Sequence, residues 1–382
     1  MVAFKKEIEY LTSNPFSLKI KKLIDFWGYI LFNRNKKVGE IDLRKINSIT
    51  IVHMGHIGDI VLMLPMIDAL RNNFKGKIIL VVNQYVRELA KLIRGVDKVY
   101  SVPHPKFSRT NSTSWFETFK IFKGLESDIV FEAGCYFFSI PFSFLIRKKL
   151  FVGYNVSGLG FLFDVVLDYP FNRHIIRKYF KFLDFLSIPE PQIKPLSEYL
   201  LLDTIKFNKT QSILRIEENY IVLGIGAGAQ AKDWPDDYFI QLVERLSELN
   251  IVVVLVGKLD LIRAGKYKIF ENNTKVINLI NKTNIGEVLK IIERAKIFIG
   301  LDSGLTHCAS MLGIKTVAIF SGTTGIGIWD PINLRNNVYI FRANVPCNNN
   351  GQGCGLKFCQ DNICMKFISP EHVYQKVKNQ LE

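Results

Sequence analysis

The chain has 382 residues, 48% of them hydrophobic, which is enough for two domains of ordinary size with buried cores and excludes a largely disordered protein. Its 50 Lys and Arg against 35 Asp and Glu give a formal net charge of +15. This balance favours an anionic partner such as a nucleotide, a phosphorylated glycan, an acidic membrane surface or nucleic acid, unless the basic surface is merely solvated.

Residues 1–48 form a basic appendage ahead of the first core strand. The segment from Leu18 to Phe32 mixes bulky apolar residues with three lysines. This composition is typical of a helix on a membrane surface, and a helix packed on the following domain is an equally good interpretation. No apolar segment follows the first lysines and no run approaches the roughly 18 residues of a membrane span, so we expect a cytoplasmic protein.

Residues 49–190 alternate apolar runs with helical patterns, which predicts a parallel sheet covered by helices on both faces. Strands are expected at 48–53, 77–82, 98–102 and 128–131, and helices near 59–73, 85–93 and 115–125.

Three prolines then interrupt the pattern, at Pro189, Pro191 and Pro195. We therefore place a linker at 191–215, a second domain at 216–368 and a closing helix at 369–382. Strands are expected in the second domain at 220–223, 251–256, 297–300 and 316–320, and helices near 236–249, 260–270, 285–295 and 305–312. The predicted fold class is α/β, with two Rossmann-like doubly wound domains facing a cleft, and ligands are expected beyond the carboxyl ends of the strands.

The first strand-to-helix turn runs from His53 to Asp59 (HMGHIGD). Its glycines let the backbone approach a ligand closely. Asp59 stands at the start of a helix, where a carboxylate can act as a general base on an acceptor hydroxyl. Alternatively it only caps the helix, whose positive end also lowers the pKa of a carboxyl and weakens it as a base.

The second turn covers 224–235 (GIGAGAQAKDWP). Gly226 and Gly228, on either side of Ala227, leave backbone N–H groups for phosphate oxygens. Lys232 could neutralise the charge that develops on a leaving diphosphate, although a solvated lysine is equally consistent. The pattern is neither GxGxxG nor a P-loop, which argues against NAD enzymes and NTPases.

The third turn covers 299–307 (IGLDSGLTH). Asp302, Ser303 and the N–H groups of Gly304 and Leu305 could surround a phosphate. Alternatively, Asp302 or Ser303 caps the helix and His307 faces the sheet. GxSxG is absent, so a Ser-His-Asp hydrolase is a poor interpretation.

Four cysteines gather near the end of the chain: Cys347, Cys354, Cys359 and Cys364. Their gaps contain no CxxC pair, so free thiols in a loop are favoured over a zinc site. We predict no metal.

With these turns in this order, the sequence resembles glycosyltransferase family 9, the ADP-heptose:lipopolysaccharide heptosyltransferases. Three segments carry the resemblance: 51–70 with its GD pair and LP helix, 226–246 with KxWP, and 297–323 with D-[ST]-G-x-x-H. Residues 141–174 and the ending from Cys364 to Val373 resemble the family as well. The resemblance spans about 49–380.

The resemblance implies a GT-B architecture and an inverting, metal-independent transfer from a nucleotide-diphosphate sugar, with no cofactor required. It makes Asp59 the base and Lys232 the diphosphate contact. Residues that it places around the donor are Gly226, Ala227, Gly228, Thr283, Asp302, Ser303, Gly304, Leu305 and His307. It makes Asp260 the candidate ribose contact.

The partners that the resemblance implies are ADP-heptose as the leading donor and a lipid-linked or phosphorylated glycan as acceptor, at the cytoplasmic face of the inner membrane. The basic aromatic segment 172–182 is a candidate acceptor or membrane face, or else an ordinary amphipathic helix. No nucleic-acid module is recognisable. The alternatives are another nucleotide sugar, a sugar-nucleotide epimerase of the same fold, and a non-catalytic membrane- or glycan-binding protein.

Overall fold

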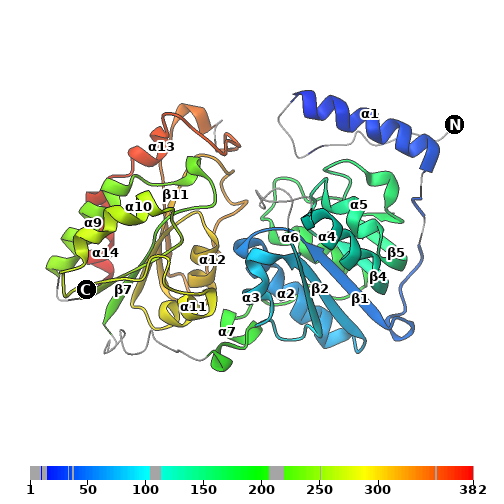
Figure 1. Ribbon diagram of the computed structural model, residues 1–382, viewed down its shortest axis with the longest axis horizontal. Helices are drawn as coiled ribbons and strands as arrows, with labels where there is room; N and C mark the ends of the chain where they lie inside the picture. The colour runs from blue at the N-terminus through cyan, green and yellow to red at the C-terminus, as the bar shows by residue number, and fades with distance from the viewer. Residues whose placement is uncertain are drawn as a thin grey trace. The chain divides into compact units, whose positions relative to one another are not determined.

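The computed structural model describes residues 10, 15–32, 34–36, 38–103, 113–205, 219–249, 251–348 and 351–381. The chain divides into two compact units, Met1–Gln192 and Ile193–Glu382, each with its own sheet and core (Figure 1). Residues 206–215 of the predicted linker, and 1–9 and 11–14 of the predicted appendage, lie outside the described residues.

The N-terminal unit is built on a six-stranded parallel sheet in the order β3-β2-β1-β4-β5-β6. Its strands are β1 (Ser48–His53), β2 (Lys77–Asn83), β3 (Lys98–Val102), β4 (Glu126–Glu132), β5 (Arg147–Gly153) and β6 (Val165–Val166). The central strands are buried apolar runs, as expected for a sheet covered on both faces.

Four helices of this unit connect its strands, one precedes the first strand and one follows the last strand among the described residues. They are α1 (Pro15–Phe32), α2 (Ile57–Asn73), α3 (Arg87–Ala90), α4 (Thr113–Lys123), α5 (Ser139–Phe144) and α6 (Ile176–Phe185). One core cluster joins side chains of β1, β2 and β4 to α4 and α5. α2 packs against α6, and most of its side chains are buried.

The C-terminal unit repeats the plan, with a parallel sheet in the order β12-β11-β10-β7-β8-β9. Its strands are β7 (Tyr220–Gly224), β8 (Val252–Val256), β9 (Val276–Asn278), β10 (Ile297–Leu301), β11 (Lys315–Phe320) and β12 (Val338–Arg342). Its helices are α7 (Leu196–Tyr199), α9 (Asp236–Glu248), α10 (Leu261–Lys266), α11 (Ile285–Glu293), α12 (Gly304–Met311), α13 (Ile363–Lys366) and α14 (Pro370–Leu381).

Alternate strand residues of this sheet belong to two different core clusters. Ile221 and Leu223 pack with α9 and α14, whereas Val222 packs with α11 and α12. Figure 1 shows α9, α10 and α14 on one side of the sheet and α11 and α12 on the other. The strands are therefore buried on both faces, as the continuous apolar runs predict.

The structure also differs from the expected elements. β5, β6, β9 and β12 were not predicted, because they lie at or next to sheet edges and are short or partly exposed instead of continuously apolar. The helix expected near 85–93 is only a four-residue α3 behind a short 3-10 turn. The helix expected near 260–270 ends at Lys266 and continues as a 3-10 helix to Phe270.

Within the described part of the chain, no helix is long and apolar enough to cross a membrane.

Candidate active site

The first candidate group lies at the carboxyl end of β1, where the chain turns into α2. β1 ends at His53, and Asp59 is the third residue of α2. A Cβ built on Gly55 would stand 2.4 Å from His53 Cε1 and 2.6 Å from Asp59 Oδ2. Because such contacts are sterically forbidden, only glycine at this position lets His53 and Asp59 approach each other.

His53 is fully buried and connects the turn to α6. The Gly55 N–H donates to His53 Nδ1 over 3.0 Å, so the neutral imidazole carries its proton on Nε2. That Nε2 lies 3.0 Å from the Tyr179 hydroxyl and 3.9 Å from Asp59 Oδ1. Burial lowers the pKa of His53 to about 3, which keeps the ring neutral near pH 7.

Asp59 is only 8% exposed. Its Oδ2 accepts a hydrogen bond of 2.9 Å from the His56 N–H. Burial alone would raise the pKa of Asp59, but the fields of His53 and Lys178 and this hydrogen bond outweigh it and hold the pKa below its ordinary value. Asp59 is therefore an ionised carboxylate near pH 7, and its surroundings do not make it more basic.

Lys178 is a buried cation that the sequence analysis did not single out. Its side chain is 4% exposed, and it precedes Tyr179 on α6. Ile175, Lys178 and Phe182 have the i, i+3, i+7 spacing of one helical stripe, and this spacing could have placed Lys178 on the buried face. Much of α6 is buried against its unit, which favours the amphipathic-helix interpretation of segment 172–182.

Glu132 is a second buried acid of this unit, at the end of β4. Burial raises the pKa of Glu132 to about 7, although the hydroxyls of Ser143 and Ser139 donate hydrogen bonds to its carboxylate. Lys178 also acts on Glu132 electrostatically. The N-terminal unit thus combines one ionised carboxylate with one that changes charge near neutral pH.

The second candidate group begins at the glycine-rich turn after β7. Gly226 has φ +88°, in the left-handed region that glycine favours, and a Cβ there would stand 2.8 Å from Leu259. The Ala227 N–H donates to Asp233 Oδ1 over 2.9 Å, so this amide belongs to a bond within the turn. Open space surrounds the position of a Cβ on Gly228, which leaves room for a ligand there.

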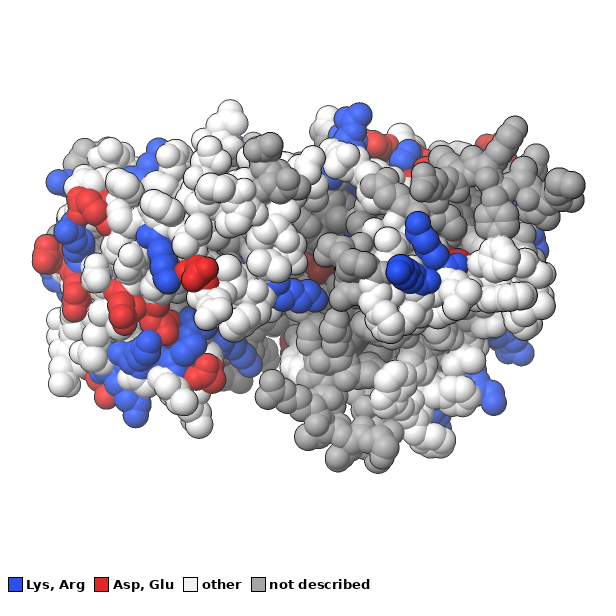
Figure 2. Space-filling model, turned by 90° about the horizontal axis from the view of Figure 1, so that it is seen from above, with Lys and Arg blue, Asp and Glu red and all other residues white. Residues whose placement is uncertain are grey.

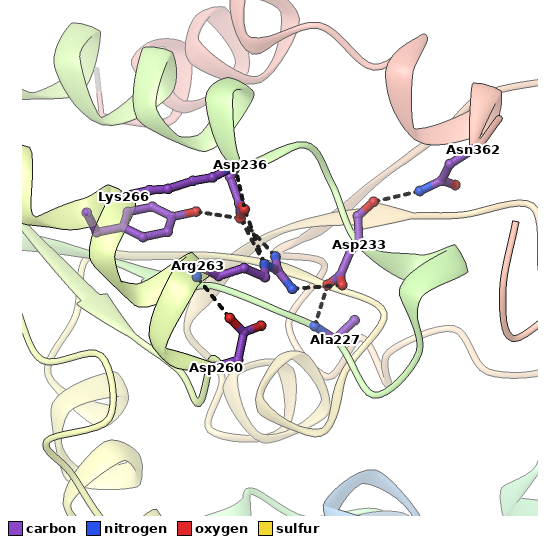
Figure 3. A network of polar contacts seen from close by, with 8 residues as sticks. Ala227, Asp233, Asp236, Asp260, Arg263, Lys266 and Asn362 are labelled. Atoms are coloured by element: carbon purple, nitrogen blue, oxygen red, sulfur yellow. Dashed lines mark hydrogen bonds and ion pairs between the residues drawn. The ribbon is translucent and has the colours of Figure 1, made fainter. Parts of the chain in front are cut away.

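A network of charged residues fixes this turn (Figure 3). Arg263 reaches Asp233 at 2.9 Å and Asp236 at 2.8 Å. Lys266 pairs with Asp236 at 3.3 Å, and the Asn362 side chain donates to the Asp233 carbonyl over 2.8 Å. One arginine of α10 thereby joins the glycine-rich turn to the start of α9.

Lys232 and Asp302 join the second turn to the third. Lys232 Nζ lies 2.7 Å from Asp302 Oδ2, with 24% of the lysine side chain and 5% of the aspartate exposed. The Thr324 hydroxyl donates to the same oxygen over 3.3 Å. Thr324 follows β11 and was not predicted, although its position beyond the carboxyl end of a strand could have indicated it.

Asp302 leads into α12, which begins at Gly304. Ser303 is the residue before the helix, and its side chain makes no capping hydrogen bond. The first N–H groups of a helix, here those of Gly304 and Leu305, have no acceptor within the helix and favour an anion. His307 is buried one turn further along.

Two predicted donor contacts lie apart from the Lys232–Asp302 pair. Asp260 is exposed and accepts a hydrogen bond of 3.0 Å from the Arg263 N–H, which caps α10. A surface depression beside the charged network is lined by residues that include Asp260 and Arg263. Thr283 is half-buried between β9 and α11, and β7 and β8 separate its strand from β10.

The cysteines of the C-terminal segment are free thiols: Cys347 is exposed, Cys354 and Cys359 are half-buried and Cys364 is buried. Burial raises the pKa of Cys364. Among the described residues, no group of three or more His, Cys, Asp or Glu side chains is arranged to hold a metal ion. The expected absence of a metal stays a prediction.

Comparison with protein families gives a match over residues 126–355, more than half of the chain, to glycosyltransferase family 9 (heptosyltransferase). This confirms the resemblance drawn from the three motifs. The match begins at the start of β4, so the Asp59 turn lies ahead of it.

Comparison with curated proteins identifies lipooligosaccharide heptosyltransferase 2 of Campylobacter jejuni, 33% identical over 182 residues, which are 46% of this chain and 55% of that protein. Lipopolysaccharide heptosyltransferase 3 of Escherichia coli is 24% identical over 161 residues, 41% of this chain and 46% of that protein. The chain thus spans about half the length of the curated relatives it matches.

Solved structures share the fold at low identity. The Escherichia coli heptosyltransferase WaaC with ADP has a TM-score of 0.68 and 17% identity, over 87% of this chain and 99% of that one. A family 9 glycosyltransferase of Veillonella parvula has a TM-score of 0.67 and 17% identity, over 88% and 97%. These similarities, together with the two parallel sheets, confirm the expected α/β fold class of GT-B type.

Proposed function

Because the chain belongs to glycosyltransferase family 9, we propose that it is an inverting glycosyltransferase that moves a heptose from ADP-heptose to a lipopolysaccharide or related surface-glycan acceptor. The names of its relatives, lipooligosaccharide and lipopolysaccharide heptosyltransferases, support the sugar and the acceptor class. A solved neighbour in complex with ADP supports the nucleotide.

The observation that carries the proposal is the Lys232–Asp302 pair beside the start of α12. Asp302 holds the ammonium of Lys232 at 2.7 Å, and a lysine has three N–H donors, of which this contact uses one. The other donors and the first N–H groups of α12 can bind the oxygens of a diphosphate. This arrangement suits stabilisation of a departing nucleotide, whose negative charge grows as the glycosidic bond breaks.

The reaction that we propose is a single displacement. The acceptor hydroxyl oxygen attacks the anomeric carbon, its proton passes to the Asp59 carboxylate, and the bond between that carbon and the diphosphate oxygen breaks. The nucleoside diphosphate leaves with both electrons of the broken bond, and Lys232 balances its charge. One displacement inverts the anomeric centre, so neither a covalent intermediate nor a second carboxylate is needed.

The low pKa of Asp59 sets how it acts in this scheme. A carboxylate that stays ionised is ready to accept a proton over a wide pH range, but it is too weak a base to remove one from a resting hydroxyl. We therefore propose that proton transfer to Asp59 occurs late, when the new bond to carbon has already made the hydroxyl acidic.

No cofactor or metal enters this scheme, because Lys232 and the α12 N–H groups are proposed to supply the positive charge. The net charge of +15 supports a phosphorylated or lipid-linked acceptor, and with it a place on the cytoplasmic face of the inner membrane. We propose no role for nucleic acid.

The first experiment is a thermal-shift comparison of ADP, UDP, GDP and CMP with the purified chain and its Lys232→Ala variant. A bound ligand stabilises the folded chain by roughly RT ln(1 + [L]/Kd), so a selective binder stands out. Lys268→Ala, an exposed lysine of the same unit, is the matched control.

Selective stabilisation by ADP that weakens in Lys232→Ala but not in Lys268→Ala supports the proposal and leads to a transfer assay with ADP-heptose, with and without a chelator. Selective stabilisation by UDP or GDP keeps the glycosyltransferase and removes heptose as the sugar. If none of the four nucleotides stabilises the chain, the phosphate-binding role of Lys232 is wrong.

A further inference from the structure

The outer face of α1 is apolar, the reverse of an ordinary surface helix. Eight of the exposed large hydrophobic side chains among the described residues lie within its 18 residues: Phe16, Ile20, Leu23, Phe26, Trp27, Ile30, Leu31 and Phe32. Trp27 is 54% exposed and Leu31 64%. A helix on a soluble surface normally turns such side chains toward the core.

The inner face of α1 mixes polar and apolar residues and is attached to the N-terminal unit, where Ile24 and Tyr29 pack against a core cluster. Asp25 is 2% exposed and accepts hydrogen bonds of 2.6 Å from both the Leu159 N–H and the Tyr10 hydroxyl. Gly28 packs so closely on Phe161 that a Cβ there would stand 2.1 Å from the ring. The helix therefore cannot rotate its apolar face inward without losing a buried carboxylate's partners and colliding with an aromatic ring.

The segment that follows α1 fixes the helix further. The N–H groups of Arg34 and Lys36 donate to the carbonyls of Phe161 and Asp164 over 3.1 and 2.7 Å. The Asn35 side chain donates to the Phe163 carbonyl over 2.7 Å. Contacts made by residues within α1 and by the segment after it thus hold the apolar side chains in their outward direction.

The charge of the outer face is positive. Lys19 and Lys22 are exposed between the apolar side chains, and the one acidic residue of α1, Asp25, is buried on the opposite side. On the N-terminal unit's side of the view in Figure 2, basic side chains stand among uncharged ones with few acidic ones. This face combines exposed apolar area with charge opposite to that of anionic lipid headgroups.

We propose that the outer face of α1 docks onto a lipid bilayer that contains anionic lipids. The helix lies along the surface, with Trp27 and its apolar neighbours at the boundary between headgroups and acyl chains and with Lys19 and Lys22 among the headgroups. Docking brings the chain to the surface that carries a lipid-linked acceptor. That purpose rests on the proposed function, whereas the docking itself does not.

The test is co-sedimentation of the full chain with vesicles of phosphatidylethanolamine and phosphatidylglycerol, and separately with vesicles of neutral phosphatidylcholine. We expect Leu23→Glu/Trp27→Glu to lower the vesicle-bound fraction at least about tenfold on both kinds of vesicle. Lys19→Gln/Lys22→Gln lowers binding to the anionic vesicles roughly fivefold per lysine and hardly affects the neutral ones. Leu261→Glu/Ile262→Glu, two exposed apolar residues of α10, is the matched control and binds like the wild type.

The inference is overturned if Leu23→Glu/Trp27→Glu binds vesicles as well as the wild type does. A second contrary result is a wild type that does not bind vesicles but forms a dimer in sedimentation velocity, which Leu23→Glu/Trp27→Glu converts to a monomer. The outer face of α1 would then bind a second copy of the chain. Circular dichroism and ADP binding, measured on every variant, show whether the fold and the nucleotide site are intact. Loss of nucleotide binding with vesicle binding intact counts against the proposed function alone.

Discussion

Asp59 and Asp302 occupy similar places in their two units but have different neighbours. β1 and β10 are each the third strand from one edge of a parallel sheet. Asp302 directly follows its strand, and Asp59 is the third residue of the helix after its strand. Asp302 has a lysine at 2.7 Å, whereas the ring nitrogens of His53 and His56 each lie 3.9 Å from an oxygen of Asp59, and His53 is neutral near pH 7.

The difference teaches that a strand-to-helix turn determines only where a carboxylate is placed. Its chemistry depends on the residue that another segment brings to it. Lys232 comes from the turn after β7 and is held by Asp302, so this carboxylate positions a cation. Lys178 comes from α6 and acts on Asp59 without a direct ion pair, so this carboxylate stays ionised with an oxygen available for a proton.

Asp59→Asn gives the largest expected effect and tests this distinction directly. The amide oxygen can still accept from the His56 N–H but the side chain cannot take a proton, so transfer should fall by about 10²–10⁴-fold. Initial rates with ADP-heptose and calorimetric binding of ADP provide the measurement.

ADP affinity should change little in Asp59→Asn, because the residue belongs to the other unit. For the wild type, the lowered pKa of Asp59 predicts that protonation of this carboxylate limits activity only at pH values below the ordinary range of an aspartate. A variant with wild-type rates would show that Asp59 is only a helix cap.

Glu132→Gln sharpens the contrast between the two acids of the N-terminal unit. Burial raises the pKa of Glu132 from 4.5 to about 7, so its protonated form stabilises the fold below pH 4.5, and this contribution disappears as the pH rises to 7. The shift corresponds to about 3 kcal/mol. Urea unfolding measures the free energy of unfolding of Glu132→Gln and of the wild type at pH 5 and pH 8. The variant should exceed the wild type by up to that amount only at pH 8.

Ser143→Ala serves as a control for Glu132→Gln, because it removes one hydroxyl that donates to the same carboxylate. It should destabilise the wild-type background more at pH 8 than at pH 5. A pH-independent difference between Glu132→Gln and the wild type would mean that Glu132 does not titrate in this range.

A double-mutant cycle of Lys232→Ala and Asp302→Asn tests whether Asp302 acts through Lys232. Each single variant should slow transfer, and the double variant should be no slower than Lys232→Ala, with a coupling of about 1–2 kcal/mol. Steady-state rates of all four proteins provide the numbers. Additive losses would instead assign Asp302 a separate contact with the donor.

Asp260→Ala gives the smallest expected effect. Loss of the cap on α10 should lower the free energy of unfolding by about 1 kcal/mol or less. If Asp260 also contacts the ribose, ADP affinity falls as well, which calorimetry detects. Asp260→Asn, which can still cap the helix, separates stability from nucleotide binding.

The sequence predicts the central strands well, whereas β3 is the one edge strand of the two described sheets that it predicts. β1, β8 and β10 are buried on both faces and appear as continuous apolar runs. β5 begins with three basic residues, Arg147 to Lys149, and β12 is partly exposed at the edge of its sheet, so neither shows such a run. Periodicity detects burial, and edge strands are only partly buried.

The candidate site divides in a similar way. The turns that carry Asp59, Lys232 and Asp302 are visible in the sequence because glycines and charged residues follow apolar strands. Lys178 is not visible in this way, because it reaches Asp59 through the packing of α6 on α2. The bond between the Ala227 N–H and Asp233 was equally hidden, since a local pattern does not show which amides the turn itself uses.

The segment that carries Lys232 is held by hydrogen bonds to residues that follow β12 in the chain. The Ala231 N–H donates to the Lys357 carbonyl over 3.1 Å, and the Trp234 indole donates to the Ile368 carbonyl over 2.8 Å. During synthesis, a nascent chain that has emerged only as far as β12 already contains every strand of the second sheet but lacks these acceptors. Because domains fold as their residues emerge, Lys232 is positioned only after Ile368 has emerged, and a ribosome-bound chain that stops at β12 should not bind nucleotide.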